Sequence, residues 1–252
     1  MNLFNIKGKN AIITGANRGL GKGVAEGLLD AGCHVVIIAR NTKTQKIVDE
    51  YKKQGKECDV VFCDLANREE RGKAFDTAVS LCNGKLDILV NVAGVQIRHP
   101  AEEFPLADFD KVMEINLNAT YDYCIRAAQV MLPNKSGKII NFASMLSWFG
   151  GYTVSAYAAS KGGVAQITKA FSNEWASKGL QVNAIAPGYM DTDMNTALVN
   201  NPVRNEAISK RIPAQRWGTA EDVIGPVIFL ASDASNYLNG AIIPVDGGYL
   251  NR

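Results

Sequence analysis

Apolar runs of strand length recur along this chain, and longer amphipathic stretches separate most of them. The runs read NAIIT, HVVIIA, DVVFC, LDILVN, GKIINFA, LQVNAIA and GAIIPV. They are apolar at nearly every position, as strands covered on both faces require. The amphipathic stretches lie at 19–31, 67–82, 108–132 and 154–178. This alternation predicts an α/β fold, a doubly wound parallel sheet of about seven strands with helices on both faces.

The organisation of the chain predicts a single domain over residues 1–252. Its 252 residues are 47% hydrophobic, enough for one large core, and no repeat or Pro/Gly/Ser-rich linker divides them. One long irregular stretch, near 188–218, carries Asn, Asp and Pro among Met, Leu and Ile. Such a long connection in a compact domain is usually functional, so we expect a substrate lid there.

Charge and cysteine usage argue against several classes of protein, although a local basic patch stays possible. The 27 basic and 25 acidic side chains nearly balance, which argues against a nucleic-acid or anionic-membrane surface. The N-terminus lacks the apolar region of a signal peptide, and the five cysteines form no C-x-x-C pair, so we expect reduced thiols in a cytoplasmic protein. His34 and His99 lie far apart without metal-ligand spacing, and no metal site is predicted.

The segment TGANRGLG, residues 14–21, directly follows the first predicted strand and opens the first predicted helix. Gly15 permits a tight turn, Gly19 leaves room for a pyrophosphate, and Gly21 lets the helix pack close to the strand. The free N–H groups of the helix N-terminus then face the phosphates. The position of this turn predicts a dinucleotide-binding site and a fold of the Rossmann type.

The end of the second predicted strand indicates which dinucleotide binds. Enzymes that use NAD place an acidic side chain there to bind the ribose hydroxyl, but this chain has Ala39 followed by Arg40. Arg18 and Arg40 could both contact a 2′-phosphate. Either arginine could instead be a solvated surface charge. Together they favour NADP(H), with NAD(H) possible.

Two further segments follow predicted strands at the carboxyl edge of the sheet, where ligands bind in this type of fold. Asp64 and Leu65 follow the third strand and are expected beside the adenine. The segment NVAG, Asn91 to Gly94, ends the fourth strand.

The segment YAASK, residues 157–161, places a phenol and an ammonium group four residues apart. If the segment is helical, Tyr157 and Lys161 lie on one face within reach of one bound molecule. Alone, this spacing is a weak signal.

In combination the motifs become specific. TGANRGLG, NVAG, Asn116 in MEINLNAT, Ser144 in NFASM, YAASK and APGYMDT occur in the order and at about the spacing of the short-chain dehydrogenase/reductase family. The resemblance covers essentially the whole chain. It implies an NAD(P)-dependent oxidoreductase that interconverts a secondary alcohol and a ketone.

The resemblance implies a role for each catalytic residue. Tyr157 would exchange a proton with the substrate oxygen, and Lys161 would lower the pKa of Tyr157 from its usual value near ~10 while holding the nicotinamide ribose. Ser144 would orient the substrate oxygen. Asn116 would fix the helix that carries it and anchor a water leading from Lys161 to solvent. A strand-end hydroxyl and a helix-capping amide are the alternatives for Ser144 and Asn116.

The resemblance also implies a cofactor site built from the segments above and from a loop that packs on the nicotinamide. The predicted cofactor-binding residues are Gly15, Asn17, Arg18, Gly19, Leu20, Gly21, Arg40, Asp64, Leu65, Asn91, Ala93, Gly94, Tyr157, Lys161, Pro187, Gly188 and Thr192.

One position departs from the family pattern, which usually reads Asn-Asn-Ala-Gly where this chain has Val92 in the second place. The change puts in doubt one local supporting hydrogen bond.

A narrower resemblance concerns the substrate. INFASMLSWFGG, NEWASKGLQVNAIAPGYM, KRIPAQRWG and VDGGYLNR look like the branch of 2-deoxy-gluconate and 2-keto-3-deoxygluconate dehydrogenases. A sugar acid is therefore the expected substrate class. The alternatives are a general 3-oxoacyl or carbonyl reductase and a cofactor-sensing protein without turnover.

A sugar acid needs a fixed cation, and Arg98 in GVQIRHP is the candidate, with His99 as its neighbour. It lies where the chain leaves the carboxyl end of the fourth strand. A surface ion pair with Glu102 or Glu103 is the alternative. Ser144 and Tyr157 complete the predicted substrate contacts.

Family resemblance also suggests a homotetramer or homodimer. The small and apolar residues on 119–130 and 163–171 suit a helix face that packs against a second subunit, and they equally suit packing on the sheet.

Overall fold

The computed structural model describes residues 2–252, and a seven-stranded parallel sheet forms its centre. The strand order is β3-β2-β1-β4-β5-β6-β7. The bounds are Asn10–Thr14 (β1), His34–Ala39 (β2), Cys58–Phe62 (β3), Ile88–Asn91 (β4), Gly137–Phe142 (β5), Leu180–Pro187 (β6) and Ile242–Val245 (β7). The predicted fold class is confirmed.

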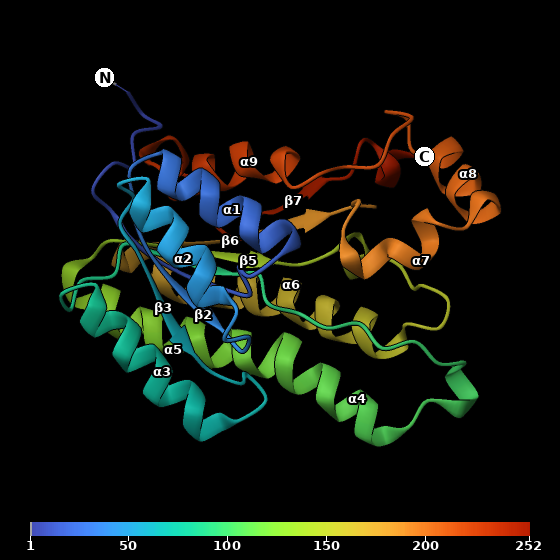
Figure 1. Cartoon of the computed structure of the whole chain (residues 1–252), viewed down its shortest axis with the longest axis horizontal. Helices are drawn as coiled ribbons and strands as arrows, with labels where there is room; N and C mark the ends of the chain where they lie inside the picture. The colour runs from blue at the N-terminus through green and yellow to red at the C-terminus, as the bar shows by residue number, and fades with distance from the viewer. Residues whose placement is uncertain (1) are drawn as a thin grey trace.

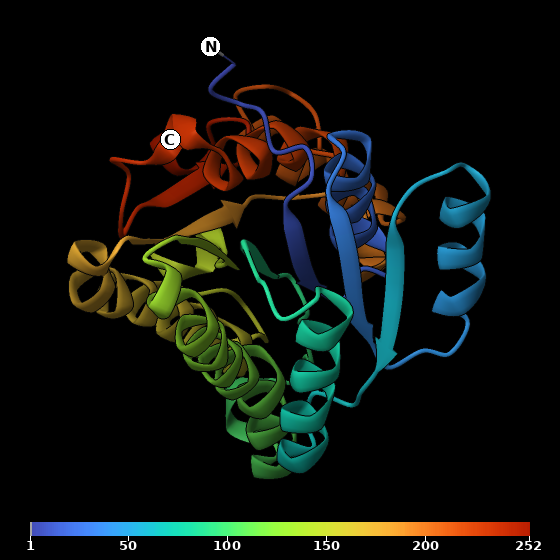
Figure 2. The ribbon, with the colours of Figure 1, turned by 90° about the vertical axis from the view of Figure 1, so that its left-hand side faces the viewer.

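Helices cover both faces of the sheet, as Figures 1 and 2 show. One buried cluster joins the sheet to α1, α2 and α9, and a second joins it to α3, α5 and α6. The bounds are Gly19–Asp30 (α1), Thr44–Lys53 (α2), Arg68–Leu81 (α3), Leu106–Met113 (α4), Ala119–Met131 (α5), Ser155–Trp175 (α6), Thr196–Val199 (α7), Pro202–Arg211 (α8) and Glu221–Ala231 (α9). The inner strands β1, β2, β4, β5 and β6 are therefore buried from two sides, as their apolar sequences predict, whereas the edge strands β3 and β7 are partly exposed.

The amphipathic stretch at 108–132 does not form one uniform helix. It is divided into α4 and α5 by a π-helical turn over Glu114–Asn118. Such turns are rare and frequently lie at functional sites. This one carries Asn116, one of the predicted catalytic residues.

The predicted lid, residues 188–218, contains the short helices α7 and α8, which project beyond the sheet in Figure 1. Its apolar residues Leu198, Ile208 and Ile212 pack with Met145 and Tyr249 in a small separate cluster. The lid is therefore attached to the loop after β5 and to the C-terminal segment.

The chain reverses its direction of strand addition between β3 and β4. From β1 it adds β2 and β3 on one side, then returns to place β4 on the other side of β1. In open parallel sheets ligands bind at such a switch point, at the carboxyl ends of the strands.

Candidate active site

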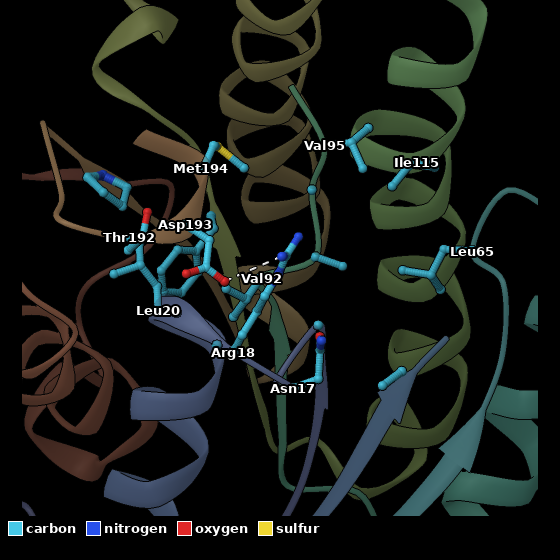
Figure 3. Close-up of a pocket in the computed structure, with 18 of the residues that line it drawn as sticks. Asn17, Arg18, Leu20, Leu65, Val92, Val95, Ile115, Thr192, Asp193 and Met194 are labelled. Carbon is cyan, nitrogen blue, oxygen red and sulfur yellow. Dashed lines mark hydrogen bonds and ion pairs between the residues drawn. The ribbon is translucent and has the colours of Figure 1, made fainter. Parts of the chain in front are cut away.

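A cavity of about 520 Å³ lies at this switch point (Figure 3). Its wall contains most of the residues that the sequence predicts: Gly15, Asn17, Arg18, Gly19, Leu20, Gly21, Arg40, Asp64, Leu65, Ala93, Gly94, Ser144, Tyr157, Lys161, Pro187, Gly188 and Thr192. Asn91, Arg98 and Asn116 are not among its lining residues.

The glycine-rich turn is shaped by close backbone contacts. Gly15 has φ +72°, and a Cβ atom added there would lie 2.7 Å from the Cα atom of Ala93. A Cβ atom on Gly21 would overlap the carbonyl group of Gly15. Helix α1 begins without a side-chain cap and has no acidic residue in its first turn, so its first N–H groups are free for an anionic ligand. The turn therefore fits a dinucleotide phosphate.

Thr14 joins this turn to the end of β4. Its Oγ1 accepts hydrogen bonds from the backbone N–H groups of Val92 and Ala93, both at 3.1 Å. The Val92 side chain, the departure from the family pattern, lines the cavity and packs against the core cluster that includes β1.

Asn91, which the sequence predicts as a cofactor-binding residue, does not line the cavity. It is buried within the sheet, where its Nδ2 donates to Asn141 Oδ1 at 3.0 Å, and Asn141 Nδ2 donates to Thr168 Oγ1 at 3.0 Å. Buried amides need hydrogen-bond partners, and these connect β4, β5 and α6. The side chain of Asn91 therefore fixes the end of β4 against β5 and α6.

The two arginines that the sequence assigns to a 2′-phosphate both line the cavity, and each faces a carboxylate. The guanidinium of Arg18 lies 3.3 Å from Asp193, and that of Arg40 lies 3.7 Å from Asp64. Arg18, Asp193 and Arg40 are largely exposed and Asp64 is partly exposed, so these ion pairs contribute little to stability.

The predicted catalytic side chains meet at the carboxyl ends of β5 and the start of α6. Ser144 follows β5, and its Oγ accepts a hydrogen bond from Leu146 N at 3.2 Å. Ser147 Oγ donates to the carbonyl of Lys161 at 2.7 Å, which ties this loop to α6. Tyr157 and Lys161 lie one turn apart on α6, with Lys161 Nζ 5.7 Å from the centre of the Tyr157 ring.

Burial controls the protonation of this pair. It raises the pKa of the Tyr157 phenol to about 12, although a hydrogen bond with Ser144 acts in the opposite direction. It lowers the pKa of Lys161 to about 8. Burial is the larger effect on the pKa of Tyr157, and Lys161 Nζ donates to Phe142 O at 2.5 Å, so a role of Lys161 in lowering the pKa of Tyr157 stays a prediction. At neutral pH Tyr157 is a neutral phenol able to donate a proton.

Asn116 braces the loop after β4 against α6. Its Oδ1 accepts from Val95 N at 2.8 Å, and its Nδ2 donates to Val95 O at 2.9 Å and to Ser160 Oγ at 3.1 Å. A Cβ atom on Gly94 would lie 3.4 Å from Asn116 Oδ1 and 3.8 Å from Lys161 Nζ. Asn116 therefore positions the backbone beside Lys161.

Arg98 is exposed and lies outside the cavity wall. Its Nη2 donates to Gln96 Oε1 at 2.8 Å, so the alternative pairing with Glu102 or Glu103 is not seen either. The backbone of the neighbouring His99 donates to Thr153 O at 3.1 Å, which ties this loop to the segment before α6.

Some lining residues were missed by the sequence analysis. Most are neighbours of predicted residues, and the chain order alone could have suggested them: Ile38, Asn41, Cys63, Val95, Ile115, Phe142, Ala143, Met190, Asp193, Met194 and Asn195.

Comparison with known protein families gives a match over nearly the whole chain. A family model described as enoyl-(acyl carrier protein) reductase matches residues 15–250. The chain belongs to the short-chain dehydrogenase/reductase family. The predicted family is thereby confirmed, and with it an oxidoreductase that acts on CH–OH groups with a nicotinamide cofactor.

Individual members of the short-chain dehydrogenase/reductase family match over nearly their full length. The chain is 45% identical to a 2-dehydro-3-deoxy-D-gluconate 5-dehydrogenase of Pseudoalteromonas atlantica, covering 99% of this chain and 98% of the relative. It is 44% identical to the enzyme of that name from Bacillus subtilis, covering 99% and 97%. A crystal structure of gluconate 5-dehydrogenase from Burkholderia cenocepacia, in complex with NADP and tartrate, has a TM-score of 0.95 and 37% identity, covering 100% and 98%.

None of the helices within residues 2–252 is long and apolar enough to cross a lipid bilayer.

Proposed function

We propose that this short-chain dehydrogenase/reductase interconverts a secondary alcohol and a ketone on a sugar acid, with NADP(H) as its cofactor. The observation that carries the proposal is the placement of Ser144, Tyr157 and Lys161 at one end of a cavity whose other end is a glycine-rich phosphate turn. The relatives named for gluconate derivatives, and the one bound to NADP and tartrate, support the substrate class and the cofactor.

In this proposal each side chain has one task. NADP(H), when bound, supplies or accepts the hydride. Tyr157 donates its phenolic proton to the substrate oxygen during reduction and removes it during oxidation. Ser144 donates a hydrogen bond to that oxygen, and protonated Lys161 stabilises the phenolate that forms. Asn116 holds the backbone beside Lys161 in place.

Two residues at the end of β2 support NADP(H) as the cofactor. Ala39 stands where NAD-dependent enzymes have an acidic side chain, and Arg40 supplies a cation for the 2′-phosphate. We expect wild-type enzyme to show the higher kcat/KM with NADPH, and Arg40→Asp to shift the preference toward NADH. Steady-state kinetics with both cofactors measures the ratio. A wild-type enzyme that strongly prefers NADH would contradict the assignment.

The substrate end contains no arginine among the lining residues, since Arg18 and Arg40 belong to the phosphate turn and to the end of β2. We propose that Arg98, on the loop that leaves the cavity at Val95, reaches the substrate carboxylate from the rim. Loss of a charge-assisted contact costs about 1.5–3 kcal/mol. Arg98→Ala should therefore raise the KM for a sugar acid at least about tenfold and leave a neutral ketone unaffected.

A substrate panel tests the function as a whole. Purified protein is assayed with aldonic, uronic and keto-deoxy sugar acids, with 3-oxoacyl thioesters and with neutral ketones, using both cofactors. Turnover of the acids with the highest kcat/KM supports the proposal. Preference for the thioesters would favour the acyl reductase suggested by the description of the family model. Binding of cofactor without turnover of any compound would favour a sensing protein.

We also propose a cytoplasmic enzyme, folded as one catalytic domain with residues 188–218 as its lid.

A homotetramer or homodimer is supported by the partly exposed aromatic side chain of Tyr121 on α5, which lies 5.2 Å from the ring of Phe171 on α6. Light scattering on the purified protein measures the number of subunits.

A further inference from the structure

The first turn of the predicted lid is tied across the cavity to the phosphate turn. Asp193 Oδ2 accepts a hydrogen bond from Arg18 Nη1 at 3.3 Å, and the dashed line in Figure 3 shows this pair crossing the cavity. The preceding residue, Thr192, lies 3.7 Å from the position of a Cβ atom on Gly19. Two consecutive lid residues therefore lie over two consecutive residues of the turn.

Asp193 places a negative charge beside groups that attract anions, namely the N-terminus of α1 and Arg18. The turn offers the free N–H groups of α1 and the cation of Arg18. The other acidic residue of the cavity wall, Asp64, faces Arg40 instead. A cofactor phosphate bound to Arg18 would lie close to the Asp193 carboxylate, because both would contact the same guanidinium. The negative charges of the phosphate and the carboxylate would repel each other there.

We propose that Asp193 competes with a phosphate of the bound cofactor for Arg18, so that cofactor binding exchanges the lid contact for a phosphate contact. Asp193 is then a residue that sets cofactor affinity and, where the 2′-phosphate is the competitor, the preference between NADPH and NADH. The Arg18–Asp193 ion pair is exposed, so breaking it costs little free energy and the exchange is reversible. The inference rests on the proposed use of a nicotinamide dinucleotide at this cavity.

The test compares Asp193→Asn with the matched control Asp191→Asn. Asp191 lies two residues earlier on the same exposed segment, and within residues 2–252 its side chain forms no ion pair. Both variants remove one negative charge at nearly the same place, but only Asp193→Asn frees Arg18. Dissociation constants for NADPH and NADH are measured by fluorescence titration of the full chain, alone and combined with Arg18→Ala.

Asp193→Asn is expected to tighten cofactor binding by about two- to fivefold more than Asp191→Asn does, the range that an exposed ion pair supports. The gain should vanish in the Arg18→Ala background. Tightening confined to NADPH identifies the 2′-phosphate as the competitor, and equal tightening of both cofactors identifies the pyrophosphate.

Three results would overturn the inference: equal effects of the two aspartate variants, weaker binding in Asp193→Asn, or a gain that persists without Arg18. None of them depends on which cofactor the wild-type enzyme prefers. A wild-type preference for NADH would contradict the proposed cofactor while leaving the exchange at Arg18 testable through the pyrophosphate.

Discussion

Tyr157→Phe is expected to lower the turnover number by roughly 10²-fold or more. The variant lacks only the phenolic hydroxyl, which is the proton donor in the proposed reduction. Its ring still fills the same space, so cofactor binding should be retained. Steady-state kinetics and fluorescence titration with the preferred cofactor measure the two effects separately.

A matched control exists five residues earlier. Tyr152 is 90% exposed, and Tyr152→Phe removes the same atom outside the cavity wall. We expect this control to retain the turnover of the wild type. Near-normal turnover in Tyr157→Phe would show that the proton comes from another group.

Gly21→Ala should weaken cofactor binding by about tenfold or more. The added methyl group would overlap the carbonyl of Gly15, so either the turn or the start of α1 must shift. Overpacking of this kind costs about 1–3 kcal/mol. Because the displaced atoms form the phosphate-binding turn, much of the effect should appear as a higher dissociation constant for NADPH in a fluorescence titration.

Two other glycines serve as controls that distinguish a loss of cofactor affinity from a general loss of stability. A Cβ atom on Gly23 would lie 2.6 Å from Ala220 Cβ, in the contact between α1 and α9, so Gly23→Ala should lower the melting temperature with less effect on affinity. A Cβ atom added at Gly162 of α6 would meet no atom outside its own stretch of helix within 4 Å, and Gly162→Ala should be neutral or stabilising. Equal loss of affinity in Gly21→Ala and Gly23→Ala would argue against a specific role for the turn.

The sheet and the phosphate turn were predictable because their signals are local. Continuously apolar runs identify buried parallel strands, and the glycines of TGANRGLG lie within one short segment. Sheet geometry alone did not bring Ser144, Tyr157 and Lys161 together; their grouping followed from the resemblance to the short-chain dehydrogenase/reductase family.

The parts that were missed depend on contacts distant in the sequence or on burial. Arg18 and Asp193 are 175 positions apart, and no local pattern joins them. The Asn91 side chain turns into the sheet because Asn141 lies beside it on β5. The raised pKa of Tyr157 follows from desolvation, which a linear motif does not encode.

The π-helical turn at Glu114–Asn118 joins α4 and α5 into one continuous helical run and changes the direction in which the side chains of α5 point relative to those of α4. Successive residues of an α-helix are rotated by about 100° around its axis. A π-helical turn contains one extra residue, so it rotates the side chains that follow it relative to the side chains that precede it. Helix α4 can thus pack on α6 while α5 packs on β4 and β5. The π-helical turn therefore lets one continuous run of helix present one face to α6 and another to the sheet.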